Sequence, residues 1–133
     1  MQIEAPCAVQ VSNKMLWTGR IVSFVPALLI LFGAIVKLMK IPAVVQGFAQ
    51  HGYPEHLVVV VGIIELACTI IYLIPQTSVL GAILMTALMG GATDANVRVG
   101  DPTYVVTVFL GVLIWGGLYL RDPRLRVLIP VRK

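Results

Sequence analysis

Long apolar runs separated by short polar connections dominate the sequence. The clearest run is LVVVVGIIELACTIIYLI, which extends from Leu57 to Ile74 and is followed by Pro75. A helix rises about 1.5 Å per residue, so a run of this length crosses most of a hydrocarbon layer about 30 Å thick. The run therefore predicts a membrane-spanning helix over residues 57–74.

Three more runs of the same kind predict spans over residues 18–39, 78–97 and 104–120. The connection after Ile74 is so short that the next helix must return antiparallel beside the previous one. Residues 41–56 are only moderately apolar, and we expect them to form an interfacial or partly re-entrant connection that caps the bundle. The pattern thus predicts an all-α fold, a four-helix transmembrane bundle in which residues 1–133 form a single transmembrane domain.

The composition supports a membrane location and argues against a nucleic-acid partner. The chain is 59% hydrophobic and only 12% charged, whereas soluble domains average roughly 25% charged residues. The net charge is +4, but half of the basic residues follow the last apolar run: Arg121, Arg124, Arg126, Arg132 and Lys133. A tail of this kind is typical of a membrane-surface anchor. The lipid bilayer is therefore the expected partner, and nucleic acid is not.

The lysines and arginines also predict how the bundle is oriented. With four spans, both ends of the chain and the turn after Ile74 share one side of the membrane, together with seven basic residues. The other side has three, Lys37, Lys40 and Arg98. Because basic residues favour the cytoplasmic side, we expect both termini in the cytoplasm.

Glu65, near the centre of the 57–74 span, is the most informative single residue. An ionised carboxylate at this depth is costly unless it faces protein, water or a cation. Thr69 and Tyr72 follow it at helical spacing and share its face. One interpretation is that Glu65 hydrogen-bonds to a neighbouring helix and fixes packing. The other is that it binds a ligand or handles a proton, and the residues alone leave both open.

Four polar residues near the ends of neighbouring spans are predicted to share the outer half of the bundle with Glu65: Lys37, Asp94, Asn96 and Arg98. Lys37 is either a counter-ion to Glu65 or Asp94, or an anchor whose ammonium reaches the lipid headgroups. Arg98 either joins this cluster or meets lipid phosphate or Asp101.

Small residues lead into Asp94. Ala82, Thr86 and Gly90 lie one helical turn apart on the stripe that Asp94 extends, and small residues allow close helix packing in lipid. This stripe would bring Asp94 into the bundle, although a solvated helix end fits the same residues. The Gly90–Gly91 pair is expected to loosen the helix there.

The sequence contains no complete catalytic or metal-binding motif. His51 and His56 lack a recognised metal-ligand spacing, so no metal is expected. Cys7 and Cys68 do not form a CxxC pair, which leaves dithiol chemistry without its residues. There is no glycine-rich phosphate loop, serine elbow or catalytic triad. The residues identify no cofactor.

Several segments resemble the DoxX-like family of small four-span membrane proteins. They are GAIVKLM (33–39), HGYP (51–54), GIIEL (62–66), LIPQTSVLGAILMTALMGGA (73–92) and LRDPRLRVLIP (120–130). The resemblance implies a four-helix bundle in a bacterial inner membrane. Related members are described as a subunit of a thiosulfate:quinone oxidoreductase and as a membrane partner of redox enzymes, and distant relatives as assembly chaperones.

The resemblance carries over only a few candidate positions. Family members often have a histidine near the end of the third span, where this chain has Asn96 or Val97. This departure weakens any transfer of a catalytic role. Lys37, Glu65 and the polar cluster of the third span are therefore transferred as candidate positions only.

Two functions fit these observations. The first is a membrane accessory or binding protein that holds a lipophilic small molecule or a redox partner in an outer-half polar pocket, formed by Lys37, Glu65, Thr69, Tyr72, Asp94, Asn96 and Arg98. The second is a membrane enzyme, an oxidoreductase subunit or isomerase, acting on a quinone or isoprenoid-like substrate with Glu65 and Asp94 as acid and base. A redox enzyme or a second copy of the chain are the candidate protein partners. The lack of a complete catalytic constellation favours the first function, and the lack of an inverted repeat argues against transport.

Overall fold

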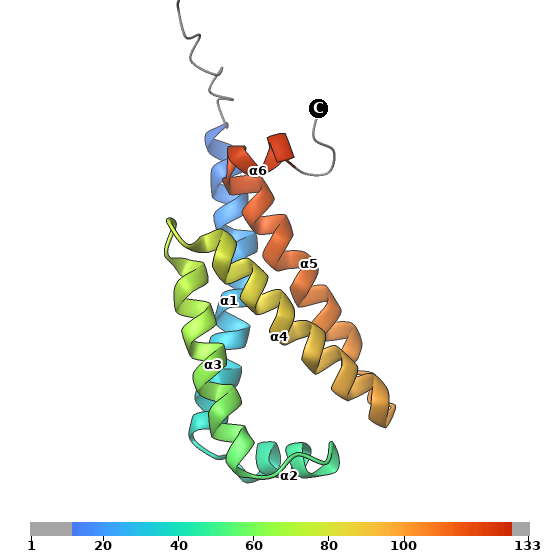
Figure 1. Ribbon diagram of the computed structural model, residues 1–133. Coiled ribbons are helices and arrows are strands. Elements are labelled where there is room, and N and C mark those ends of the chain that lie inside the picture. The colour runs from blue at the N-terminus through green and yellow to red at the C-terminus, as the bar shows by residue number, and fades with distance from the viewer. Residues whose placement is uncertain (1–11, 129–133) are drawn as a thin grey trace, which may run out of the picture.

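The computed structural model describes residues 12–128, which form helices and no strands (Figure 1). In chain order the helices are α1 (Asn13–Leu38), α2 (Pro42–Gln50), α3 (His56–Leu73), α4 (Ser78–Val99), α5 (Tyr104–Arg121) and α6 (Pro123–Leu128). Four of them, α1, α3, α4 and α5, are long and apolar enough to cross a membrane. The predicted all-α, four-helix fold is thus confirmed. Cys7 and the last two basic residues, Arg132 and Lys133, lie outside the described range.

The four long helices form a ring in which each packs against two neighbours. The helix α1 contacts α3 and α5, and α4 contacts the same two helices. Within residues 12–128 the backbones of α1 and α4, and of α3 and α5, do not approach each other comparably, so these two pairs lie diagonally across the bundle and only long side chains join them. Successive long helices run in opposite directions, which places the start of α1 beside the end of α5 (Figure 1).

The outer surface of the bundle is strongly apolar. Large side chains such as Phe24, Phe32, Ile63, Phe109 and Val112 are more than half exposed. Soluble proteins rarely expose so much contiguous apolar surface, whereas a bundle in lipid must present it outward. The burial pattern therefore agrees with the membrane assignment made from the length and composition of the helices.

Glycines bring the helices into close contact at one end of the ring. A Cβ on Gly81 of α4 would lie 2.3 Å from the Cα of Tyr72 on α3. A Cβ on Gly117 of α5 would similarly meet the backbone of Ser23 on α1, with the Ser23 Cα at 2.8 Å. Such contacts replace the hydrophobic driving force that helices lack in lipid. They fix how α3 and α4, and likewise α1 and α5, are rotated against each other.

Toward the other end the ring opens. Figure 1 shows α4 and α5 leaning away from α1 and α3 toward the end at which α2 lies. The short helix α2 starts at Pro42, which suits a first helical position because proline lacks the N–H that would be unpaired there. The connection between α1 and α3 thus consists of the nine-residue helix α2, which lies at the open end, followed by an irregular segment over residues 51–55. It is not a fifth span.

Arginines of the basic tail interact with the end of α5. Arg126, in α6, donates hydrogen bonds to the carbonyl oxygens of Tyr119 and Leu120, at 3.1 and 2.5 Å. The last carbonyls of a helix have no partner within the helix, so these contacts satisfy them. The described part of the tail thus folds back on α5.

Candidate functional site

A cavity of about 1000 Å³ lies between the diverging parts of α3 and α4, with α2 at its open end. Apolar side chains form most of its wall, among them Val61, Ile64, Leu84 and Leu88. The polar lining residues include Lys37, His51, Glu65, Asn96, Asp101 and Thr103. Small-molecule sites typically occupy roughly 300–1000 Å³ and combine apolar walls with a few convergent polar groups.

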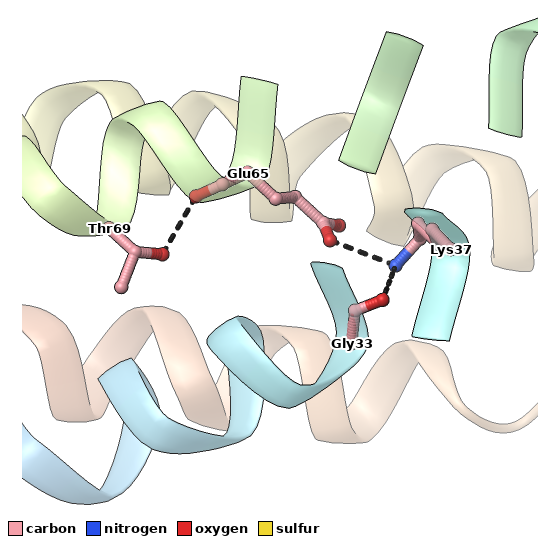
Figure 2. Close-up of polar contacts among 4 residues, drawn as sticks. All are labelled: Gly33, Lys37, Glu65 and Thr69. Carbon is pink, nitrogen blue, oxygen red and sulfur yellow. Dashed lines mark hydrogen bonds and ion pairs between the residues drawn. The ribbon is translucent and has the colours of Figure 1, made fainter. Parts of the chain in front are cut away.

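The deepest polar feature of the cavity is an ion pair between α1 and α3. Lys37 Nζ lies 2.9 Å from Glu65 Oε2, and it also approaches the carbonyl oxygen of Gly33 at 3.5 Å (Figure 2). The two side chains keep only 18% and 11% of their surface exposed. Glu65 lies nine residues beyond the first residue of α3, His56, which corresponds to about 14 Å along the helix. The pair is thus well inside the bundle.

The side chain of Lys37 runs back along its own helix. Side chains on a helix point toward its N-terminus, and the contact with Gly33, four residues earlier, shows that Lys37 follows this direction. Its ammonium therefore points away from the nearby end of α1 and into the bundle. The counter-ion interpretation of Lys37 is confirmed, and the headgroup-anchor interpretation is wrong.

A glycine of α3 allows α1 and α3 to approach closely at this pair. A Cβ on Gly62 of α3 would lie 3.1 Å from the Cβ of Lys37 and 3.2 Å from the carbonyl oxygen of Ala34, so the bare backbone lets α1 and α3 approach. A Cβ on Gly33 would lie 3.5 Å from Lys37 Nζ and 3.9 Å from Glu65 Oε2. Glycine at position 62 thus brings α1 and α3 close enough for the ammonium and the carboxylate to meet, whereas a Cβ at position 33 would be in ordinary contact with both.

Thr69 and Tyr72, expected on the same ligand-binding face as Glu65, are instead packed in the core. Both side chains are fully buried, and neither lines the cavity. Thr69 Oγ1 donates to the backbone oxygen of Glu65 at 2.7 Å, and the Tyr72 hydroxyl donates to the carbonyl oxygen of Ile114 on α5 at 2.9 Å. The structure thus does not bring these two side chains to the cavity with Glu65, because helical spacing identifies a shared face, while the neighbouring helices cover part of that face.

Asp94 is not brought to Glu65. It is exposed, it lies outside the cavity wall, and it has no hydrogen-bond or ion-pair partner within residues 12–128. The small residues of α4 that line the cavity are Ala87, Gly91, Ala92 and Ala95, three of them one position beyond the predicted stripe. The stripe itself packs against a neighbour as expected, since Ala82 is fully buried and the Trp115 indole N–H of α5 donates to Thr86 Oγ1 at 2.7 Å, but it does not bring Asp94 into the bundle. The helix α4 also continues without a break through Gly90 and Gly91, so the expected loosening does not occur.

A second polar group links the residue after α2, His51, to α4. His51 Nδ1 is 2.6 Å from the carbonyl oxygen of Gly47, and Nε2 is hydrogen-bonded with Asn96 Oδ1 at 2.9 Å. Arg98 donates to the backbone oxygen of His51 at 3.2 Å and lies over the ring of Tyr53, 5.9 Å from its centroid. Asn96 and Arg98 therefore hold the end of α2 and do not reach toward Glu65. Sequence reasoning examined His51 only as a metal ligand and missed its contact with Asn96. The location of both residues on the predicted outer side of the bundle could have indicated this contact.

Asp101 lies at the rim of the cavity, between α4 and α5. One of its oxygens, Oδ1, accepts hydrogen bonds from the Thr103 backbone N–H at 2.9 Å and from the Thr103 hydroxyl at 2.7 Å. These two contacts lower the pKa of Asp101 below its ordinary value of 3.8, because both stabilise the ionised carboxylate. Among the described residues there is no cluster of three His, Cys, Asp or Glu side chains that could hold a metal ion.

Four apolar helices, with a buried ion pair facing a cavity in one half, define a small multi-pass membrane protein. The model of the DoxX-like family matches residues 21–117, a range that contains all of α3 and α4 and most of α1 and α5. The chain therefore belongs to the DoxX-like family. No curated protein and no solved structure matches the chain.

Proposed function

We propose that this DoxX-like protein is a membrane binding protein that holds a lipophilic small molecule in the cavity between α3 and α4. The observation that carries the proposal is the cavity itself, whose apolar wall of α3 and α4 side chains surrounds one ion pair. Binding sites for small molecules have this combination of an apolar interior and few polar groups.

The position of the ion pair favours binding over a purely packing role. A pair that served only to join α1 and α3 would be enclosed by side chains. Lys37 and Glu65 instead form part of the cavity wall. An isolated charge in an apolar setting is costly, and ionisable residues inside membrane spans usually mark functional sites.

The enzyme alternative has less support. It requires two carboxylates with different environments close to one substrate. Asp94 is exposed and outside the wall that contains Glu65. The acid and base of that mechanism are therefore not assembled around the cavity.

The expected setting of the protein belongs to the same proposal. Membership of the DoxX-like family supports a bacterial inner membrane and a redox enzyme or a second copy of the chain as protein partner. The excess of lysine and arginine on the side of the two chain ends supports cytoplasmic termini.

Two neighbouring glycines of α4 allow a matched test. Gly91 lines the cavity, whereas Gly90 lines a separate groove between α4 and α5, and a Cβ at either position would meet no atom within 4 Å. Gly91→Leu should fill the cavity, and Gly90→Leu should change helix propensity equally without entering it. Each variant and the wild type are purified from membranes in mild detergent and analysed by native mass spectrometry.

We expect a discrete small mass on the wild type and on Gly90→Leu, and its loss from Gly91→Leu. A wild type without any retained compound, or equal retention by the two variants, would overturn the proposal. Retention of a protein partner that neither variant affects would also overturn it, and would identify the chain as an accessory subunit.

A further inference from the structure

The ion pair in the cavity has hydrogen-bonding capacity that its own contacts leave unused. An ammonium has three N–H donors, and Lys37 Nζ directs them at two protein oxygens, Glu65 Oε2 and the carbonyl of Gly33. The second carboxylate oxygen, Glu65 Oε1, accepts no hydrogen bond from any residue in the described range. In Figure 2 one oxygen of Glu65 is directed at Nζ and the other is not. One donor and one acceptor therefore remain side by side in the cavity wall.

Several polar atoms at the other end of the cavity are already engaged within the protein. Both ring nitrogens of His51 have oxygen partners, and Asp101 Oδ1 accepts two hydrogen bonds from Thr103. A ligand that bound to one of these engaged atoms would have to displace its contact. The ion pair instead presents an unused donor and an unused acceptor together in a well-buried position, so the polar end of a ligand is best placed against it.

The charges of the pair restrict the ligand further. Lys37 and Glu65 together carry no net charge. A ligand with an ionised head would add an uncompensated charge to an apolar interior, which costs several kcal/mol in effective terms. A neutral head is therefore favoured over a carboxylate, a phosphate or an amine.

Resting on the proposed function of the cavity, we propose that its ligand is a neutral lipophilic alcohol. The hydroxyl accepts a hydrogen bond from Lys37 Nζ and donates one to Glu65 Oε1, since a hydroxyl is both donor and acceptor. An ether, ketone or quinone oxygen only accepts, so it leaves the Glu65 oxygen without a donor. The hydrocarbon part of the ligand lies against Val61, Ile64 and Leu88, which form the apolar wall.

Three probes with the same hydrocarbon chain test this selectivity. Radiolabelled tetradecanol is bound to the purified wild type in detergent, and unlabelled tetradecanol, tetradecyl methyl ether and tetradecanoate compete for it. Hydrogen bonds to charged groups are the stronger ones, so the ether should compete about tenfold less well than the alcohol. The carboxylate should compete less well than the alcohol because of its charge.

A double variant assigns the selectivity to the pair. Lys37→Met combined with Glu65→Leu replaces both charged groups by apolar side chains of similar length. It should still bind tetradecanol and the ether, now with affinities equal within about twofold. The comparison of probes on the wild type needs no variant, so it stands even if the double variant fails to fold.

The outcomes separate the two proposals. Equal competition by alcohol and ether, or stronger competition by the carboxylate, overturns the assignment of an alcohol. An alcohol preference that persists in the double variant overturns the role of Lys37 and Glu65. If no probe binds the wild type better than Gly91→Leu, the proposed function itself fails, and this inference fails with it.

Discussion

The ion pair between Lys37 and Glu65 can be tested by a double-mutant cycle. The two variants are Lys37→Met and Glu65→Leu, alone and combined. At 2.9 Å the attraction between the two charges amounts to about 6 kcal/mol at an effective dielectric constant of 20. The cost of removing both groups from water offsets most of it, so the double variant should be within about 1 kcal/mol of the wild type.

The single variants should differ from each other. Lys37→Met leaves Glu65 without its cation nine residues inside α3, and we expect a loss of about 3 kcal/mol. Glu65→Leu should cost only about 1 kcal/mol, because the flexible side chain of Lys37 lies one residue before the end of α1 and can turn toward the membrane surface. With the double variant within about 1 kcal/mol of the wild type, these values correspond to a coupling energy of about 3–5 kcal/mol.

Reversible unfolding measures the cycle. Each variant is titrated with sodium dodecyl sulfate in dodecyl maltoside micelles, and the helix content is followed by far-ultraviolet circular dichroism. Gly33→Ala is the control, since its Cβ would be in ordinary contact with Lys37 Nζ at 3.5 Å and should leave the pair intact. Single-variant losses that simply add in the double variant, with a coupling energy below about 0.5 kcal/mol, would refute the reasoning.

Three further predictions follow from contacts elsewhere in the bundle. Gly81→Ala should destabilise it by about 1–3 kcal/mol in the same assay, because the Cβ would lie 2.3 Å from a backbone atom of α3. The Cβ of Gly90→Ala would meet nothing within 4 Å, so this variant should stabilise the bundle by about 0.5–1 kcal/mol. Equal effects of the two variants on stability would contradict the close contact between Gly81 and α3. The pKa of Asp101 is lowered by Thr103, so its contribution to stability is complete above pH 3.8 and is lost as the pH falls through the folded-state value. Below about pH 4 the thermal midpoint of the wild type should fall more steeply than that of Asp101→Asn, and parallel curves would disprove the linkage. His51→Ala should speed amide exchange in α2 about fivefold, as expected for a lost hydrogen bond of about 1 kcal/mol, and unchanged exchange would show that His51 does not hold α2.

The sequence by itself determined the helices and their order. Each span is an apolar run long enough to cross the hydrocarbon layer, and in lipid a helix is the structure that satisfies the backbone of such a run. The three-residue turn after Ile74 required α3 and α4 to be antiparallel neighbours. The sequence also identified Glu65 and Lys37, because charged residues near the interior of apolar runs are rare enough to stand out.

Only the tertiary structure decided which faces of these helices meet. Helical spacing groups Ala82, Thr86, Gly90 and Asp94 on one stripe, but the contact of Gly81 with α3 rotates α4 so that the adjacent stripe lines the cavity. The period of a helix specifies which residues share a face. It carries no information about the neighbour that covers the face, because this depends on side chains from distant segments that must fit together. The pairing of Lys37 with Glu65 across a glycine contact, and of His51 at the end of α2 with Asn96 on α4, was settled by that fit.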